Sequence, residues 1–162
     1  TPQQVERDLA MARRMLAESL TSRLIIIEDE PLIALHVKAV VEEFGHVVAG
    51  IARTRSEAIA LARRTAPELV LADINLADGS SGIDAVQDIV QDHEVPVVFV
   101  TSFPERLLTG ERPEPTYLIT KPFDEQTLIA TIGQALMFHR ERGDGSPAVE
   151  SGLKRGERVP DT

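Results

Sequence analysis

The decisive stretch of this sequence is Glu68-Leu69-Val70-Leu71-Ala72-Asp73. Four consecutive apolar residues are typical of a short strand that is buried on both faces of a parallel sheet. Asp73 follows them directly, at the point where such a strand reaches solvent. Binding sites in an open parallel sheet form outside the carboxyl ends of its strands. We therefore expect the carboxylate of Asp73 to lie in a functional site.

Three other apolar runs of the sequence, at 24–27, 97–100 and 117–120, also end in polar residues. Those residues are Glu28 with Asp29, then Thr101, and then Lys121. If the strand ends meet at one edge of the sheet, three acids, a hydroxyl and an ammonium come together there, and they can bind a divalent cation and a phosphoryl group. Taken singly, each residue also has an ordinary explanation, as part of a solvated loop, a helix cap or a strand end. The combination is therefore much more specific than any member.

The chain from residue 23 onward alternates between short strands and helices. The strands are predicted at 23–28, 47–52, 68–73, 96–101 and 117–120. The segments between them carry apolar residues at helical spacing. Some open with helix-start signals, such as Pro31 and the pair Thr54 and Glu57. This alternation is typical of an α/β fold, with a doubly wound five-stranded parallel sheet and helices on both faces.

Three regions are expected along the chain. Residues 1–21 form an amphipathic helix that is either a linker or the end of a preceding domain. Residues 22–139 form the α/β domain, and residues 140–162, rich in Gly, Pro and charge, form a disordered tail. Because the sequence begins with Thr1 and not with Met, we expect it to be a piece of a longer protein.

The composition excludes several classes of function. Of the 162 residues, 43% are hydrophobic, which is enough for a buried core, and no apolar stretch reaches membrane-spanning length. The formal net charge of −9 argues against direct nucleic-acid binding, which depends on Lys and Arg at phosphates. There are no cysteines, so disulfides and thiolate metal sites are excluded, and we expect a cytoplasmic protein.

The acids near the strand ends suit a magnesium site. Mg²⁺ prefers hard oxygen ligands and keeps several waters, so Glu28 and Asp29 are candidate ligands beside Asp73, and Asn75 can add its backbone carbonyl. The carboxylate of Asp73 can attack phosphorus to form an aspartyl phosphate. Lys121, with a rigid proline behind it, offers a point charge for a phosphate. The sequence has no P-loop and no G-x-G-x-x-G motif after the first strand, so it lacks a nucleotide phosphate cradle.

Four motifs together resemble the receiver domain of response regulators in bacterial two-component signalling. They are Ile27-Glu28-Asp29, Ala72-Asp73-Ile74-Asn75, Val100-Thr101-Ser102 and Thr120-Lys121-Pro122-Phe123. The resemblance covers 23–138. It implies a flavodoxin-like sheet with strand order 2-1-3-4-5, an order for which a receiver is a known example.

The resemblance also implies a role for each residue of the site. Asp73 would accept a phosphoryl group from a histidine kinase or a phosphotransfer protein. The protein would then be a regulatory phosphoacceptor that assists its own phosphoryl transfer and hydrolysis, and not an enzyme. The implied Mg²⁺ ligands are Glu28, Asp29, Asp73 and the Asn75 carbonyl. The implied partners of the phosphoryl oxygens are Thr101 and Lys121.

The segment 103–116 indicates which group of receiver proteins the chain resembles most. Its prolines oppose any helix longer than a short one at 104–109. Together with 117–123, it is similar to the PhyR regulators of the alphaproteobacterial general stress response. In that family a sigma-factor-like domain precedes the receiver, and phosphorylation frees it to sequester the anti-sigma factor NepR. The implied partners are therefore a sigma-like domain in the same protein and, through it, a NepR-like anti-sigma factor.

Two departures from the receiver pattern are visible. Receivers commonly carry, three positions before the lysine, an aromatic residue that changes rotamer on activation. Leu118 stands there, with Tyr117 beside it, which argues against an ordinary aromatic switch. The usual Met-Pro after the aspartate is replaced by Leu76-Ala77-Asp78-Gly79.

Two other functions compete with this interpretation. A single-domain receiver that acts as a phosphate shuttle or sink in a phosphorelay would share every site residue. A phosphatase of the haloacid-dehalogenase type would also use an aspartate nucleophile such as Asp73. That chemistry needs a second aspartate two residues later as acid and base, and Asn75 stands there instead.

Overall fold

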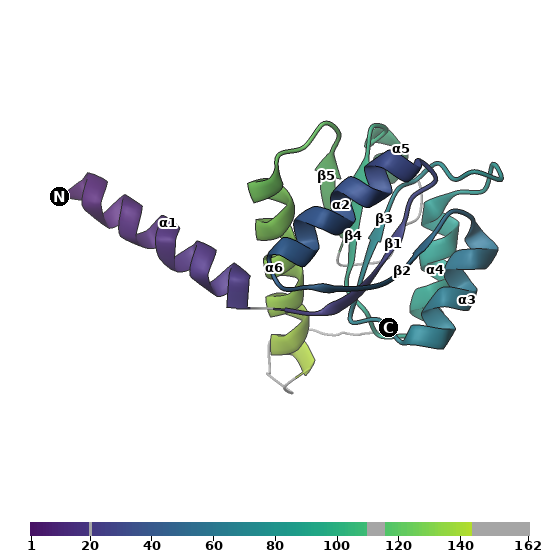
Figure 1. Cartoon of the computed structure of the whole chain (residues 1–162), viewed down its shortest axis with the longest axis horizontal. Helices are drawn as coiled ribbons and strands as arrows, with labels where there is room; N and C mark the ends of the chain where they lie inside the picture. Colours follow the sequence, from purple (N-terminus) through teal and green to yellow (C-terminus); the bar gives the residue numbers. More distant parts are fainter. Residues whose placement is uncertain (20, 110–115, 144–162) are drawn as a thin grey trace.

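The computed structural model describes residues 1–19, 21–109 and 116–143, and its centre is a five-stranded parallel sheet (Figure 1). The strand order is β2-β1-β3-β4-β5, which confirms the predicted fold. All neighbouring strands run parallel. The strands are β1 (Arg23–Ile27), β2 (Val47–Ala52), β3 (Leu69–Ala72), β4 (Val97–Thr101) and β5 (Thr116–Thr120).

Helices connect the strands and cover both faces of the sheet (Figure 1). These are α2 (Pro31–Glu43), α3 (Arg55–Thr65), α4 (Gly82–Asp92), α5 (Glu105–Thr109) and α6 (Glu125–Gly143), which follows the last strand, whereas α1 (Pro2–Ser19) precedes the first strand. The predicted start of α3 is confirmed, because the Thr54 side chain accepts a hydrogen bond from the Glu57 N–H. The Glu57 carboxylate accepts in turn from the Arg53 N–H, one residue earlier than in a capping box.

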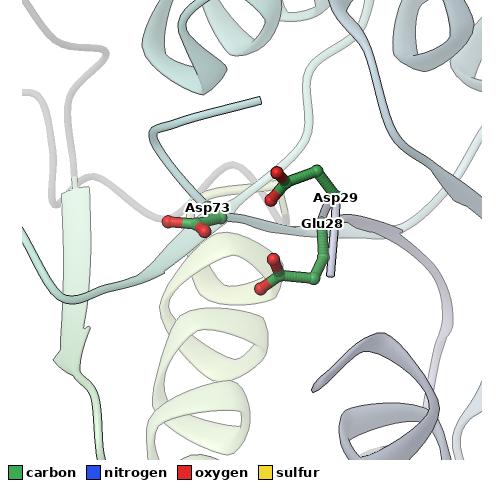
Figure 2. Close-up of side chains that lie close together, drawn as sticks. All are labelled: Glu28, Asp29 and Asp73. Carbon is green, nitrogen blue, oxygen red and sulfur yellow. The ribbon is translucent and has the colours of Figure 1, made fainter. Parts of the chain in front are cut away.

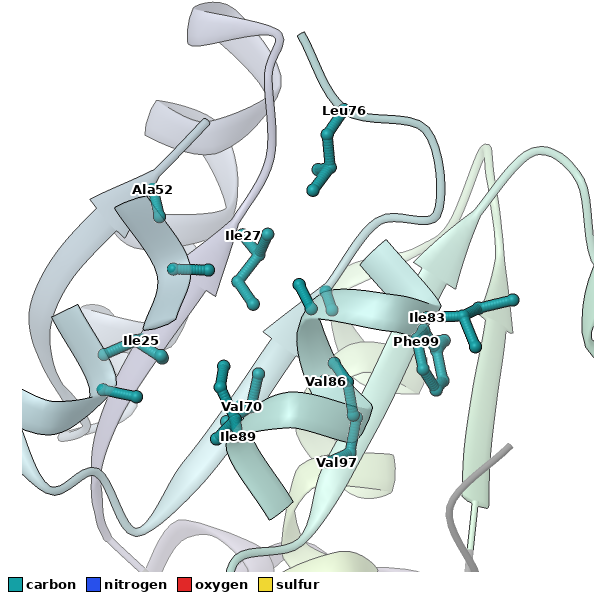
Figure 3. Close-up of a cluster of buried hydrophobic side chains, with 14 of the residues drawn as sticks. Ile25, Ile27, Ala52, Val70, Leu76, Ile83, Val86, Ile89, Val97 and Phe99 are labelled. Atoms are coloured by element: carbon teal, nitrogen blue, oxygen red, sulfur yellow. The ribbon is translucent and has the colours of Figure 1, made fainter. Parts of the chain in front are cut away.

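Successive strand residues point to opposite faces of the sheet, and so the core has two layers. On one face α3, α4 and Leu107 of α5 cover one set of strand side chains (Figure 3). That set is Ile25, Ile27, Ala52, Val70, Ala72, Val97 and Phe99. On the other face α2 and α6 cover Leu24, Ile26, Leu69, Leu71, Val98, Val100 and Ile119. β3 is buried on both faces, as its continuous apolar run predicts.

The backbone ladder continues one residue beyond the strands and fixes the residues that follow. The N–H of Glu28 donates to the Ala52 carbonyl (2.9 Å), and the N–H of Asp73 donates to the Ile27 carbonyl (2.8 Å). Likewise, the N–H of Lys121 donates to the Thr101 carbonyl (2.9 Å). These polar residues are therefore held at the carboxyl edge of the sheet, although the strands end one residue earlier than predicted at Ile27 and Ala72.

The ends of the chain differ from the expected boundaries. Helix α6 continues to Gly143, so residues 140–143 are helical and do not belong to a disordered tail. Arg140-Glu141-Arg142 contains good helix formers, and glycine is a common stop. Residues 144–162 lie outside the described residues, as do 110–115. At the other end, α1 extends away from the α/β body and meets it at α6 (Figure 1).

Within the described residues, no helix combines the length and the apolar character that crossing a membrane requires.

Candidate functional site

Three carboxylates from two strand ends meet at the edge of the sheet (Figure 2). Glu28 and Asp29 follow β1, and Asp73 follows β3, the neighbouring strand. One carboxylate oxygen from each lies within 4.8 Å of the others. Glu28 is buried, with 4% of its surface exposed, and the two aspartates are half-buried. The sequence predicted this convergence, and the structure brings all three acids together.

Lys121 connects two of these acids. Its Nζ donates to Glu28 Oε1 at 2.7 Å and to Asp73 Oδ2 at 3.1 Å. The ammonium is largely shielded from water, because only 13% of the side chain is exposed. One ammonium cannot balance three carboxylates. The cluster therefore fits a hard divalent cation, both in its oxygen donors and in its excess negative charge.

Burial changes the acid–base properties of this group. Burial and, to a smaller extent, the charge of Asp73 together raise the pKa of Glu28 from 4.5 to about 7, against the opposing effects of Lys121 and the Glu30 N–H. Burial lowers the pKa of Lys121, but its hydrogen bonds and charge attraction to Glu28 and Asp73 outweigh that effect and leave it raised. Lys121 therefore stays charged at neutral pH, and a cation at Glu28 competes with a proton.

The loop after β3 fixes the position of Asp73. Its Oδ1 accepts from the Ile74 N–H at 2.6 Å, while Oδ2 faces Lys121. Gly82, the first residue of α4, packs so closely that a Cβ there would overlap the Asp73 carbonyl oxygen. The N–H of Gly82 also donates to the Ile74 carbonyl at 2.5 Å. From the sequence alone, Gly82 is only part of a turn, and its close contact with the Asp73 backbone is not evident.

Asn75 lies in the same loop, where it forms an isolated antiparallel bridge with Ser81. Its side-chain Oδ1 accepts from Arg106 Nη1 of α5 at 2.5 Å. From the sequence, Asn75 is a candidate only through its backbone carbonyl, and Arg106 is not a candidate. No local signal could have found this contact, because the two residues are 31 positions apart.

Thr101 occupies the last position of β4 and is fully buried. Its Oγ1 accepts from the Phe103 N–H at 3.0 Å, and so its hydroxyl is engaged with the start of the segment toward α5. Like the side chain of Asn75, the side chain of Thr101 is therefore bonded outside the acid–lysine cluster, which consists of Glu28, Asp29, Asp73 and Lys121. Its backbone still joins the site, through the carbonyl that accepts from Lys121.

The family of response regulator receiver domains matches residues 24–133 of the chain. This segment includes every residue of the acid–lysine cluster. The phyllosphere-induced regulator PhyR of Methylorubrum extorquens is 55% identical over 136 residues, which make up 83% of this chain and 51% of that protein. The chain therefore spans about half the length of this relative.

Two solved structures show the same likeness. The crystal structure of the response regulator PhyR from Brucella abortus has 52% identity and a TM-score of 0.80, and the match covers 90% of this chain and 60% of that one. In a second structure, the anti-anti-sigma factor PhyR from Bartonella quintana is complexed with the anti-sigma factor NepR. It has 53% identity and a TM-score of 0.53, covering 84% of this chain and 56% of that one.

Proposed function

This chain belongs to the response regulator receiver domain family, and we propose that it accepts a phosphoryl group on Asp73 from a histidine kinase or a phosphotransfer protein. The observation that carries the proposal is the Lys121 ammonium, which lies between the carboxylates of Asp73 and Glu28 at a carboxyl sheet edge. Asp29 completes an acidic group beside them. A nucleophile, a charge partner and candidate cation ligands are thus within contact of one another.

In the proposed transfer, a carboxylate oxygen of Asp73 attacks the phosphorus of a phosphohistidine. A P–O bond forms and the P–N bond breaks, with its electron pair leaving on the imidazole nitrogen, so that an aspartyl phosphate results. Lys121 stabilises the negative charge of the phosphoryl oxygens, and the Thr101 hydroxyl, whose oxygen accepts from the Phe103 N–H, donates its proton to one of them. We assign Mg²⁺ binding to Glu28, Asp29, Asp73 and the Asn75 carbonyl. When bound, Mg²⁺ would offset charge on the transferring group.

The phosphoacceptor role can be tested with acetyl phosphate as the donor. On a phosphate-affinity gel, we expect a retarded band for the unaltered chain with Mg²⁺, and no such band for Asp73→Asn or in excess EDTA. Asp84→Asn is the matched control, because Asp84 is an exposed acid on α4 and its loss should leave the band unchanged. A band of equal yield from Asp73→Asn, or an unchanged rate in EDTA, would refute the assignment.

We propose further that the output is that of a PhyR-type regulator of the general stress response. In this scheme phosphorylation of Asp73 controls a sigma-factor-like domain of the same protein, which then sequesters a NepR-like anti-sigma factor. The proposal is supported by the identity with PhyR and by the relative that is complexed with NepR.

The output proposal needs the full-length protein, because the chain spans about half of its relative. We expect the phosphorylated full-length protein to retain an immobilised NepR-like factor, and its Asp73→Asn variant to lose that response to phosphodonor. Equal capture by both proteins, with and without phosphodonor, would contradict the proposed output and leave the phosphoacceptor chemistry untouched.

A further inference from the structure

A single hydrogen bond joins helix α5 to the loop that follows Asp73. Arg106 Nη1 donates to Asn75 Oδ1 at 2.5 Å. Asn75 lies two residues after Asp73, and Arg106 lies five residues after Thr101. The bond therefore links the segment after β4 to the residue whose carbonyl we assign to the cation.

Arg106 has an exposed side chain, but its backbone is held in place by the hydrophobic core. Its neighbour Leu107 is 2% exposed and belongs to the buried cluster under α3 and α4. The first turn of α5 is fixed by two backbone bonds, from the Arg106 N–H to the Phe103 carbonyl (3.2 Å) and from the Leu107 N–H to the Pro104 carbonyl (3.0 Å). The guanidinium thus reaches Asn75 from an anchored helix.

In the part of the chain that the structure describes, the backbone hydrogen bonds of this loop are made by the neighbours of Asn75. The Gly82 N–H donates to the Ile74 carbonyl, and the Leu76 N–H donates to the Ser80 carbonyl (3.1 Å). Neither bond uses the carbonyl of Asn75, which is therefore not fixed by this ladder. The contact with Arg106 is a direct restraint on the orientation of residue 75.

We propose that Arg106 is a positioning residue for the cation site, which acts by holding Asn75 so that its carbonyl faces the carboxylates of Glu28, Asp29 and Asp73. This inference rests on the proposed function, since the site it serves is the assigned Mg²⁺ site. Arg106 itself touches neither the cation nor the phosphoryl group in this scheme.

The direction in which Mg²⁺ affinity changes when Arg106 is removed distinguishes a positioning role from a purely electrostatic one. A guanidinium near a cation site repels the cation, so its removal would strengthen Mg²⁺ binding if charge alone mattered. Loss of a positioning contact weakens binding instead. For this exposed contact we expect the effect of a typical intramolecular hydrogen bond, which corresponds to about a three- to tenfold change in affinity.

The test is an NMR titration of the unphosphorylated chain with Mg²⁺, followed at the amides of Asp73 and Asn75. We expect Arg106→Ala to weaken Mg²⁺ binding about three- to tenfold and Arg106→Lys, which keeps a donor on a long stem, to retain part of the affinity. Arg55→Ala is the matched control. It removes the same charge from an exposed arginine that is bonded to a carboxylate, that of Asp88, and should leave the affinity unchanged.

A double-mutant cycle decides whether Arg106 acts through Asn75. Asn75→Ala removes the side-chain amide but keeps the backbone carbonyl, so Arg106→Ala should cause no further loss in that background. Unchanged or tighter Mg²⁺ binding by Arg106→Ala, or an equal loss in both backgrounds, would overturn the inference. Failure of the unaltered chain to bind Mg²⁺ would instead overturn the cation site in the proposed function, and with it this inference.

Discussion

The buried carboxyl of Glu28 lowers the stability of the folded protein when it is ionised and no cation is bound. Its carboxyl is buried, and the Glu30 N–H and the Lys121 ammonium are its hydrogen-bond partners in the described residues. Burial still dominates and raises its pKa to about 7. Without a cation, the folded protein must therefore either protonate this group or carry its charge in a poorly solvated position.

We predict that Glu28→Gln stabilises the cation-free protein at alkaline pH. The unfolded carboxyl ionises near 4.5 and the folded one near 7, so the folded state binds the extra proton between these values. Stability therefore falls as pH rises through this window, and the cost of the charge is complete above it. Gln carries no charge, and we expect its advantage to be about 1–3 kcal/mol near pH 8 and to vanish below about pH 4.5.

Urea unfolding of both proteins in EDTA, at several pH values, measures this difference. Mg²⁺ should reverse the order, because it stabilises only a folded state that binds it. A Glu28→Gln variant that is less stable than the unaltered protein in EDTA at alkaline pH would contradict the account.

At the scale of elements, the start of α4 packs against the loop that follows Asp73. Gly82 allows the first turn of α4 to rest against the Asp73 backbone, and the Ser81 side chain caps the same turn by accepting from the Ile83 N–H. The first turn of α4 and the backbone of Asp73 are therefore in direct contact, and a shift of either one moves the other.

The close contact predicts the effect of Gly82→Ala. The added methyl overlaps the Asp73 carbonyl oxygen, so we expect a loss of about 1–3 kcal/mol of stability and a slower phosphorylation of Asp73. Gly79→Ala is the comparison, because its methyl meets open space and only the backbone φ of +82° is unfavourable. It should lose about 1 kcal/mol and keep its phosphorylation rate. Equal phosphorylation rates in both variants would refute the role assigned to Gly82.

A second prediction concerns the opposite end of the sheet, where β1 and β2 begin. His46 Nδ1 accepts from the Ser22 N–H at 3.1 Å, with the Ser22 hydroxyl 3.2 Å away. Burial and, secondarily, the charge of Arg140 lower the pKa of His46 below 6.5. The unfolded state then binds a proton that the folded state rejects, so stability is lost as pH falls below 6.5.

Replacement of His46 by Gln should remove this part of the pH dependence. Gln keeps an acceptor for Ser22 but does not titrate. Urea unfolding at mildly acidic and neutral pH gives the comparison, and an identical acid-side loss in the two proteins would show that His46 is not its source.

At the scale of the whole molecule, the proposed phosphorylation signal is expected to leave the site through the strands whose ends hold Thr101 and Lys121. Thr101 and Lys121 end β4 and β5, which flank the segment containing α5. A phosphoryl group carries roughly −1.5 to −2 charges and three acceptor oxygens, and it should draw both side chains toward Asp73. Leu118, which is 38% exposed, stands at the position of the usual aromatic residue. Because leucine has no ring to rotate, the expected response is movement of the segment that contains α5.

Hydrogen exchange with and without beryllofluoride and Mg²⁺ tests this route. We expect altered protection at 103–109 and 116–120, beyond the loop that holds Asp73, because a local charge change is converted into movement of an element. The amides of α3, which packs on β2 and α4, serve as the internal reference. A change confined to the neighbours of Asp73 would show that the output leaves by another route.

Much of this molecule could be predicted from local sequence because the main signals are local. Four apolar residues before Asp73 predict a strand, and parallel strands place their ends at one edge, so the meeting of Glu28, Asp29 and Asp73 followed from pattern alone. The contact between Arg106 and Asn75 did not, since it depends on how α5 packs. The raised pKa of Glu28 likewise depends on burial by residues that are distant in sequence. The end of α6 could not be placed either, because residues 140–142 are good helix formers and the helix continues to Gly143.

Chemical trapping distinguishes Asp73 from every other residue as the proposed covalent acceptor. Borohydride reduces an aspartyl phosphate to homoserine, so the chain is phosphorylated with acetyl phosphate and Mg²⁺, reduced, digested and sequenced by mass spectrometry. We expect homoserine at position 73 and unmodified aspartate at position 29. Homoserine at another position, or none in a chain that has gained a phosphoryl group, would contradict it.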